Sequence, residues 1–200
     1  LVIPHLGQGK TVEQLIDDFD ALLPGFKKGK GIEKNQSLEV SLQYSLSRLD
    51  DDTRALLPRL SVFRGGAFED DLQEITQIDA ATWQSVRAQL VSWSLIRVEH
   101  LEGINYPFLR FHPTLAPYLA KQIKDDSKDQ LEARYWQRYY SLANFLYNTD
   151  TTNPHQARAI ARLEMPNLRR ALTLAVQAGA MEEAADFATS INRFLNYFGR

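Results

Sequence analysis

The sequence predicts a mainly α-helical chain, in which a winged-helix domain with a small β-hairpin precedes a set of antiparallel helices. Apolar residues recur at helical spacing through most of residues 38–94 and again through residues 131–198. Between them, the strand-like segments 96–98 and 108–111 flank a polar interval around Gly103, which is typical of a hairpin. Since 44% of the 200 residues are hydrophobic and 24% are charged, we expect a buried core of ordinary globular size.

Composition excludes several classes of function. The net charge of -2 and the pI near 6.1 provide no overall field that would attract nucleic acid or an anionic membrane. The absence of cysteine excludes disulfides, thiolate metal sites and cysteine nucleophiles, and makes a cytoplasmic location the default expectation. No apolar run approaches the roughly 18 residues of a spanning helix, so no membrane partner is expected. The four histidines lack the spacing of metal ligands, and no metal is expected.

Residues 1–36 predict a helix and a linker. Gly7–Thr11 is similar to the end of a phosphate-binding loop, but Pro4 stands where that motif requires its first glycine. Thr11 instead starts a helix as its N-cap, and Gln14 completes a capping box. The glycines and lysines of residues 23–36 are typical of an exposed linker, for which a phosphate-binding patch is the alternative.

Residues 37–126 predict the winged helix. A helix over 38–49 is followed by a second one that begins after Asp50–Asp52 and ends at Gly65-Gly66. Two more helices are expected at about 69–78 and 82–94, then the hairpin, and then a helix that starts at Pro113. Helices followed by a small antiparallel wing are the elements of a winged helix.

Residues 127–200 predict helices alone, after a charged junction at 124–129. The first carries an apolar stripe from Leu131 to Leu146; the second begins near Pro154 and is interrupted or kinked at Pro166. The third spans about 181–198, and its alanines and aromatics suit close antiparallel packing. No complete repeat of about 34 residues is visible, so these are expected to be entry or capping helices.

Five strings in this order resemble a known family. They are Ser37–Leu42, Leu56–Phe68, Leu90–Ile96, Phe111-His112-Pro113 and Glu164–Leu172. Together they resemble the winged-helix region and the first tetratricopeptide-like helices of STAND signal-transduction ATPases, the NB-ARC and NACHT-like regulators. The resemblance implies that residues 1–36 end a helical lid, 37–126 form the winged helix, and 127–200 begin the TPR-like repeats.

The resemblance also implies a function. The chain would be a regulatory fragment that couples a helical-repeat sensor to an ATPase core absent from this chain. It implies that ADP or ATP is bound in the full-length protein, that a protein partner binds the repeats, and that the active protein can oligomerise.

His112 is the candidate site residue. In the resembled family a Met-His-Asp-like triplet lies between the last wing strand and the next helix, and its histidine contacts the β-phosphate of ADP. Here the triplet is Phe111-His112-Pro113, so a proline replaces the acidic residue of the family's triplet. An imidazole at a helix N-terminus would have backbone donors and positive dipole charge beside it, which suits a phosphate. The alternative is a histidine that caps the helix against the core.

Other functions were weighed on the same residues. No catalytic constellation is present, so an enzyme is not expected. A DNA-binding winged helix is an alternative, but the helix at 82–94 has Arg87 as its one basic residue and the helix at 69–78 has none. A stand-alone protein-binding adaptor is the other alternative. A solvated surface is favoured over a ligand-binding basic face for four arginines: Arg158, Arg162, Arg169 and Arg170.

Overall fold

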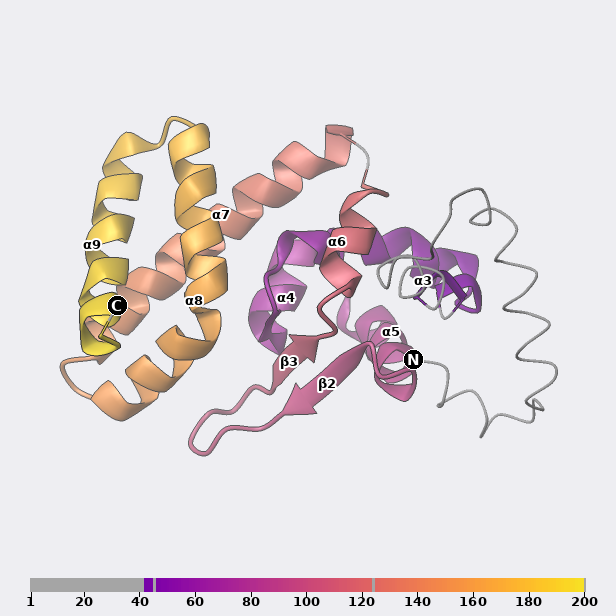
Figure 1. Ribbon diagram of the computed structural model, residues 1–200, viewed down its shortest axis with the longest axis horizontal. Coiled ribbons are helices and arrows are strands. Elements are labelled where there is room, and N and C mark those ends of the chain that lie inside the picture. The colour runs from indigo at the N-terminus through magenta and orange to yellow at the C-terminus, as the bar shows by residue number, and fades with distance from the viewer. Residues whose placement is uncertain (1–41, 45, 124, 200) are drawn as a thin grey trace, which may run out of the picture.

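Helices and one small sheet make up the computed structural model, which describes residues 42–44, 46–123 and 125–199 (Figure 1). The expectations for residues 1–36, including the lid helix and the linker, lie outside the described residues. Residues 42–44 and 46–47 are helical. The later elements are α3 (Asp51–Leu56), the 3-10 helix η3 (Leu57–Val62), β1 (Gly66–Phe68), α4 (Glu69–Thr76), α5 (Ala80–Ser92), β2 (Ile96–Glu99), β3 (Phe108–Phe111), α6 (Leu115–Ala120), α7 (Asp125–Thr149), α8 (Pro154–Gln177) and α9 (Met181–Tyr197).

The elements from η3 to β3 follow the order of a winged helix: helix, strand, two helices, then two strands. The sheet has three antiparallel strands in the order β1-β3-β2, so β1 is an edge strand. Gly66 pairs with Arg110, and Ile96 pairs with Phe111. The predicted fold class is confirmed, and the hairpin lies at the predicted residues.

Strand β1 was missed by the sequence prediction, which took Gly65-Gly66 as the end of a helix. Gly66 has φ 148°, and a Cβ placed on it would lie 2.3 Å from the carbonyl oxygen of Leu109. Glycine is therefore required here because β1 approaches β3 more closely than a side chain would permit. The glycine is part of the sheet.

The predicted second helix is divided into α3 and η3. Asp50 caps α3 by accepting from the backbone N–H of Thr53 at 2.7 Å. Pro58 lies in the first turn of η3, and η3 ends at Val62, before the extended Phe63. The prediction of one helix up to the glycines was therefore wrong, because a proline donates no backbone hydrogen bond and the chain tightens into a 3-10 turn.

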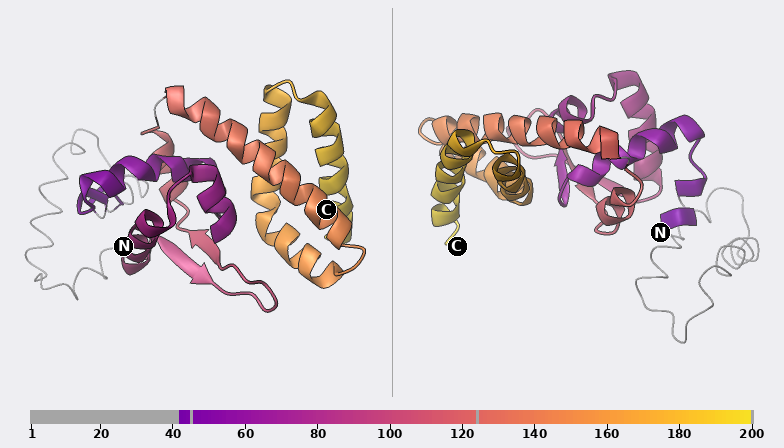
Figure 2. Two further views of the ribbon diagram at one scale, coloured as in Figure 1. Left: turned by 180° about the vertical axis from the view of Figure 1, so that it is seen from behind. Right: turned by 90° about the horizontal axis from the view of Figure 1, so that it is seen from above.

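The C-terminal helices are antiparallel neighbours, and α7 links them to the winged helix. Figure 2 shows α8 and α9 side by side, with α7 crossing from them to the winged-helix elements. α7 packs against α8, α9, α4 and η3. Helix α8 runs without interruption through Pro166 and changes direction along its length (Figure 1). The sequence predicted either an interruption or a kink at Pro166, and the predicted interruption is wrong.

A single hydrophobic cluster extends through both parts of the described chain. It includes Leu60 and Trp83 of the winged helix together with Tyr139, Leu168 and Phe187 of the long helices. The boundary expected at 126/127 falls just after the start of α7. Within the described residues, no helix combines the length and the apolarity needed to cross a membrane.

Candidate functional site at the junction of winged helix and helices

Helix α8 carries two polar side chains into the core. Glu164 and Asn167 are both fully buried, although a carboxylate and an amide are costly to desolvate. They lie on the same helix face as Ala161, Leu168 and Ala171, which are also buried. This face packs against the edge strand β1, so both polar groups meet backbone atoms of the winged helix.

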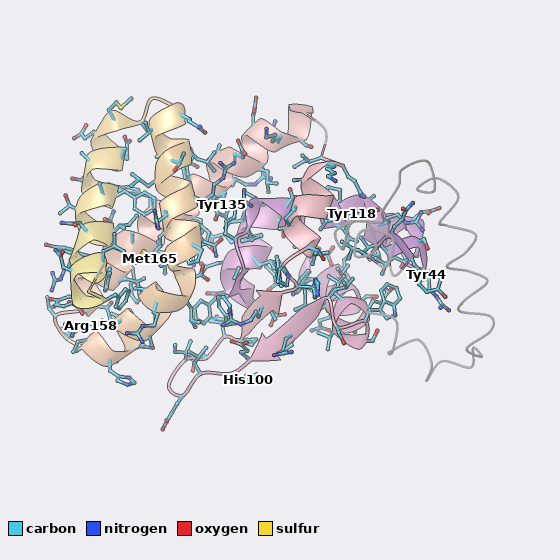
Figure 3. All side chains as sticks on the ribbon, in the orientation of Figure 1. Tyr44, His100, Tyr118, Tyr135, Arg158 and Met165 are labelled. Atoms are coloured by element: carbon cyan, nitrogen blue, oxygen red, sulfur yellow. The ribbon has the colours of Figure 1, made fainter. Side chains whose placement is uncertain are left out.

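Both the nitrogen and the oxygen of the Asn167 amide form hydrogen bonds at this junction. Its Nδ2 donates to the carbonyl oxygen of Gly66 at 2.7 Å, and its Oδ1 accepts from the backbone N–H of Arg64 at 2.6 Å. The Oδ1 also accepts from the hydroxyl of Tyr135 at 2.8 Å. Figure 3 labels Tyr135 where α7 passes between the two parts of the chain. One side chain thus binds backbone groups on both sides of Gly65.

Glu164 continues the same pattern along β1. Its Oε1 accepts from the backbone N–H of Phe68 at 3.0 Å, while its Oε2 accepts from the hydroxyl of Tyr139 at 3.0 Å and from Nδ2 of Asn167 at 2.6 Å. The groups of Gly66 and Phe68 that point away from β3 are therefore satisfied by side chains of α8. A buried strand edge needs such partners.

Burial decides the charge at this junction. It raises the pKa of Glu164 to about 8 and that of Asp71 to about 6. It also raises the pKa of the Tyr139 hydroxyl well above its usual value, with the nearby Glu164 charge as a further cause. The carboxyl groups of Glu164 and Asp71 therefore keep their protons to a higher pH than exposed carboxyl groups do.

A second polar contact joins α7 to α4. Nε of Arg138 donates to the buried Asp71 at 2.6 Å, and its Nη1 lies 3.0 Å from Glu74. One turn earlier, Nε of Arg134 donates to the carbonyl oxygen of Ile75 at 3.0 Å, near the C-terminal end of α4. α4 is thus held by α7, while β1 is held by α8.

His112 lies between β3 and α6, as expected, and is half-buried. Its Nδ1 is 2.8 Å from the hydroxyl oxygen of Thr114 and accepts from the Thr114 backbone N–H at 3.4 Å. Because a backbone N–H can only donate, this contact favours the tautomer in which Nδ1 is unprotonated and Nε2 carries the ring proton. Burial lowers the pKa of His112, which favours this neutral form.

The surroundings expected for His112 differ in two ways. Helix α6 begins at Leu115, so Pro113 precedes its N-cap Thr114 and does not occupy the first helical position. The backbone N–H groups of His112 and Leu115 donate to Leu95 and His112 oxygens, and that of Thr114 donates to the ring. These three backbone donors beside the imidazole are therefore already paired, because the chain makes a turn before a short helix.

The face that a winged helix would present to DNA has little positive charge. On α5, Arg87 forms an ion pair with Glu69 at 3.1 Å, and the same carboxylate accepts from the indole of Trp83. On the wing, Arg110 pairs with Glu99 at 2.6 Å, while Arg97 is exposed. The exposed side of α5 is neutral and consists of Ala80, Ala81, Gln84, Ser85, Ala88, Val91 and Ser92.

Three of the four arginines of α8 contact other side chains of the chain. Arg158 pairs with the buried Asp150 at 2.8 Å, and its guanidinium lies 3.8 Å from the ring centre of Tyr197; Figure 3 labels it near the C-terminal end of α9. Arg162 lies over Phe198, and Arg170 pairs with Glu132. Arg158 and Arg170 thus hold neighbouring helices together, whereas Arg162 and Arg169 are exposed, as expected of a solvated surface.

The structure thus assembles a junction that sequence reasoning did not assign. Glu164 and Asn167 were quoted as part of a family string, without a role. A signal was present, because two polar residues three positions apart fall on the apolar stripe of a helix. What they contact depends on β1, which the sequence prediction missed. Among the described residues, no cluster of histidine and acidic side chains has the arrangement of a metal site.

Comparison with known proteins identifies distant relatives. No family model matches the chain, and no solved structure matches it. Three curated mycobacterial proteins, one from Mycobacterium bovis and two from Mycobacterium tuberculosis strains, are each 30% identical over 197 residues. Each is described as a "putative HTH-type transcriptional regulator". The alignment covers 92% of this chain but 21% of each relative, so the chain spans about a fifth of their length.

Proposed function

We propose that this chain is the coupling segment of a large, multidomain transcription regulator, in which the winged helix and the C-terminal helices move as one body. The observation that carries this proposal is the attachment of Glu164 and Asn167 to the free edge of β1. A partner that binds the helices would then displace the winged helix with them, without a hinge between the two.

The energetics of the junction support movement as a unit. Separating α8 from β1 would break the hydrogen bonds that the buried side chains of Glu164 and Asn167 make with backbone groups of Arg64, Gly66 and Phe68. A buried polar group that loses its partner costs about 1–3 kcal/mol. Opening this junction is therefore costly.

The relatives' description is compatible with a coupling role. This chain corresponds to about a fifth of each relative, so the helix-turn-helix for which they are named can lie in the other part of those proteins. The neutral face of α5 and the paired Arg87 also argue against this winged helix as the part that reads DNA. We therefore assign it to transmission of a signal.

The resemblance to STAND ATPases extends the proposal to a nucleotide switch. In the longer protein, an ATPase core would hold ADP, and the Nε2–H of His112 would donate to its β-phosphate. The neutral imidazole with its ring proton on Nε2 supports this role. A signal received by the helices would withdraw His112 and permit exchange for ATP.

The test uses the full-length protein and measures the rate of ADP release. We expect His112→Ala and His112→Asn to speed release about tenfold or more, as for the loss of a charge-assisted hydrogen bond. His112→Gln places a donor near the position of Nε2 and should retain part of the effect. Asn167→Ala should also speed release if α8 positions the winged helix, whereas exposed Asn192→Ala on α9 should not. Unchanged release in every variant would contradict the proposal.

A second candidate function is direct DNA binding by this winged helix, which the description of the relatives favours. The coupling role and the DNA-binding role can be distinguished by whether the chain binds duplex DNA. Salt-dependent binding of the full chain to duplex DNA near physiological ionic strength would favour the second candidate.

A further inference from the structure

A cavity of about 520 Å³ lies where the β2–β3 loop, α4, α7 and α8 meet. Its floor is apolar and includes Phe68 and Ile160, which are buried. The β2–β3 loop extends toward the start of α8 (Figure 1), where Nε2 of Gln156 donates to the carbonyl oxygen of Gly103 at 3.1 Å. This hydrogen bond attaches the loop to α8 beside the cavity.

Two large aromatic side chains lie at this cavity in contact with solvent. Tyr106 is 54% exposed and Phe145 is 59% exposed. They come from the wing loop and from α7, which are far apart in sequence. Exposed aromatics that gather at one cavity are typical of a surface that binds a partner, because they bury a large area with little loss of side-chain entropy.

The end of the cavity at α4 is acidic. Asp70 and Asp71 line it, and Arg138 is the basic residue beside them. Arg138 donates to Asp71 at 2.6 Å and also pairs with Glu74, whereas it lies 3.9 Å from Asp70. Asp70 is 34% exposed, so its carboxylate can accept a hydrogen bond from a ligand cation.

The hollow surface continues past Arg138. A second cavity of about 220 Å³ shares Arg138 and Ser141 with the first and is also lined by Glu74. Three acidic residues and two arginines, Arg134 and Arg138, thus line the groove that the two cavities form between α4 and α7. The carboxylates of Asp70 and Glu74 are 34% and 55% exposed, which favours a cationic group of a ligand over an anionic one.

We propose that this groove binds a peptide segment of a partner protein in which an arginine or lysine adjoins an apolar side chain. The apolar side chain would pack on Tyr106 and Phe145, while the cation would donate to Asp70. The proposal is independent of the nucleotide role of His112, because it concerns a different surface of the chain.

The test is selection of a phage-displayed library of random dodecapeptides on the full 200-residue chain. We expect enriched peptides to share a basic residue next to an aromatic or aliphatic one. Synthetic copies should bind about tenfold more weakly to Asp70→Asn and to Phe145→Ala, as for the loss of one charge-assisted or hot-spot contact.

Both substituted side chains are accessible to solvent, so the variants should fold, and circular dichroism checks that they do. The matched controls are Glu182→Gln and Met181→Ala, an acidic and an apolar exposed residue at the start of α9. They should leave binding unchanged. Enrichment of no common sequence, of acidic peptides, or of peptides that bind all variants equally would overturn the proposal. So would binding that free argininamide abolishes at equal concentration, which would indicate a small-amine site.

Discussion

Asn167 shows how one residue joins two parts of this chain. Its amide binds backbone groups at positions about a hundred residues earlier, at Arg64 and Gly66. The amide of asparagine offers a donor and an acceptor on the same planar group. Asparagine is therefore matched to a strand edge, which presents an N–H and a C=O side by side.

Asn167→Ala should be strongly destabilising. The truncation leaves the backbone groups of Arg64 and Gly66, and the hydroxyl of Tyr135, without their partner in a buried site. We expect the free energy of unfolding to fall by about 3 kcal/mol or more, measured by urea denaturation. Exposed Asn192→Ala should change it by less than about 0.5 kcal/mol. Similar effects for the two variants would mean that the junction adds little stability.

Glu164 should make the stability depend on pH. Its pKa is raised to about 8, above its ordinary value of 4.5, so between these values the folded chain holds a proton that the unfolded chain releases. Stability should therefore fall as the pH rises from 4.5 to 8 and level off above. The pKa of Asp71 is raised from 3.8 to about 6, so its titration also lowers the stability as the pH rises, but only between these two values.

Glu164→Gln separates these contributions. Glutamine cannot ionise, so the decline in unfolding free energy between pH 6 and 8 should become shallower. The variant should be less stable than the wild type at pH 6, because its amide nitrogen cannot accept the hydrogen bond from Asn167. Chemical denaturation at several pH values measures both effects. An equal slope in the two proteins would show that another group titrates in this range.

At the scale of elements, α5 has the position of a recognition helix without its surface. Its apolar side is buried through Trp83, Val86 and Leu90, and its Arg87 turns to Glu69. A helix that enters the major groove needs cations for the phosphates as well as donors for the bases. The exposed side of α5 offers donors such as Gln84 and Ser85 but no cation.

Duplex DNA should therefore bind this chain weakly. At about 150 mM salt we expect no binding to a random 30-base-pair duplex in the micromolar range where non-specific binders act. Arg87→Ala should leave the DNA signal unchanged, because this guanidinium is already paired with Glu69. Fluorescence anisotropy of labelled DNA measures both. A dissociation constant that rises steeply with salt, and a loss in Arg87→Ala, would support the DNA-binding alternative.

For the whole molecule, the shared core predicts one unfolding transition. The hydrophobic cluster and the junction at Glu164 and Asn167 both cross the expected boundary at 126/127. Loss of either part would expose apolar surface of the other, which favours cooperative unfolding. Circular dichroism at 222 nm and tryptophan fluorescence should give the same midpoint in urea. Two separated transitions would indicate that the winged helix and the helices are independent domains.

The sequence by itself determined the helices and the hairpin, because these depend on local periodicity and on breaks at polar or glycine residues. It predicted the fold class and placed His112 between β3 and α6. It could not find β1, since three residues with a glycine carry no periodic signal and are stabilised only by pairing with β3.

The tertiary structure alone decided what the polar residues of the core do. Glu164, Asn167 and Asp71 meet their partners only after segments distant in the sequence come together, and spacing along a helix does not specify such contacts. The tertiary structure also decided which arginines form ion pairs, because packing places acidic side chains beside Arg87, Arg110 and Arg158. Hydrogen bonds and ion pairs depend on distances of a few ångströms in space, whereas hydrophobic periodicity can be recognised from residues that are neighbours in the sequence.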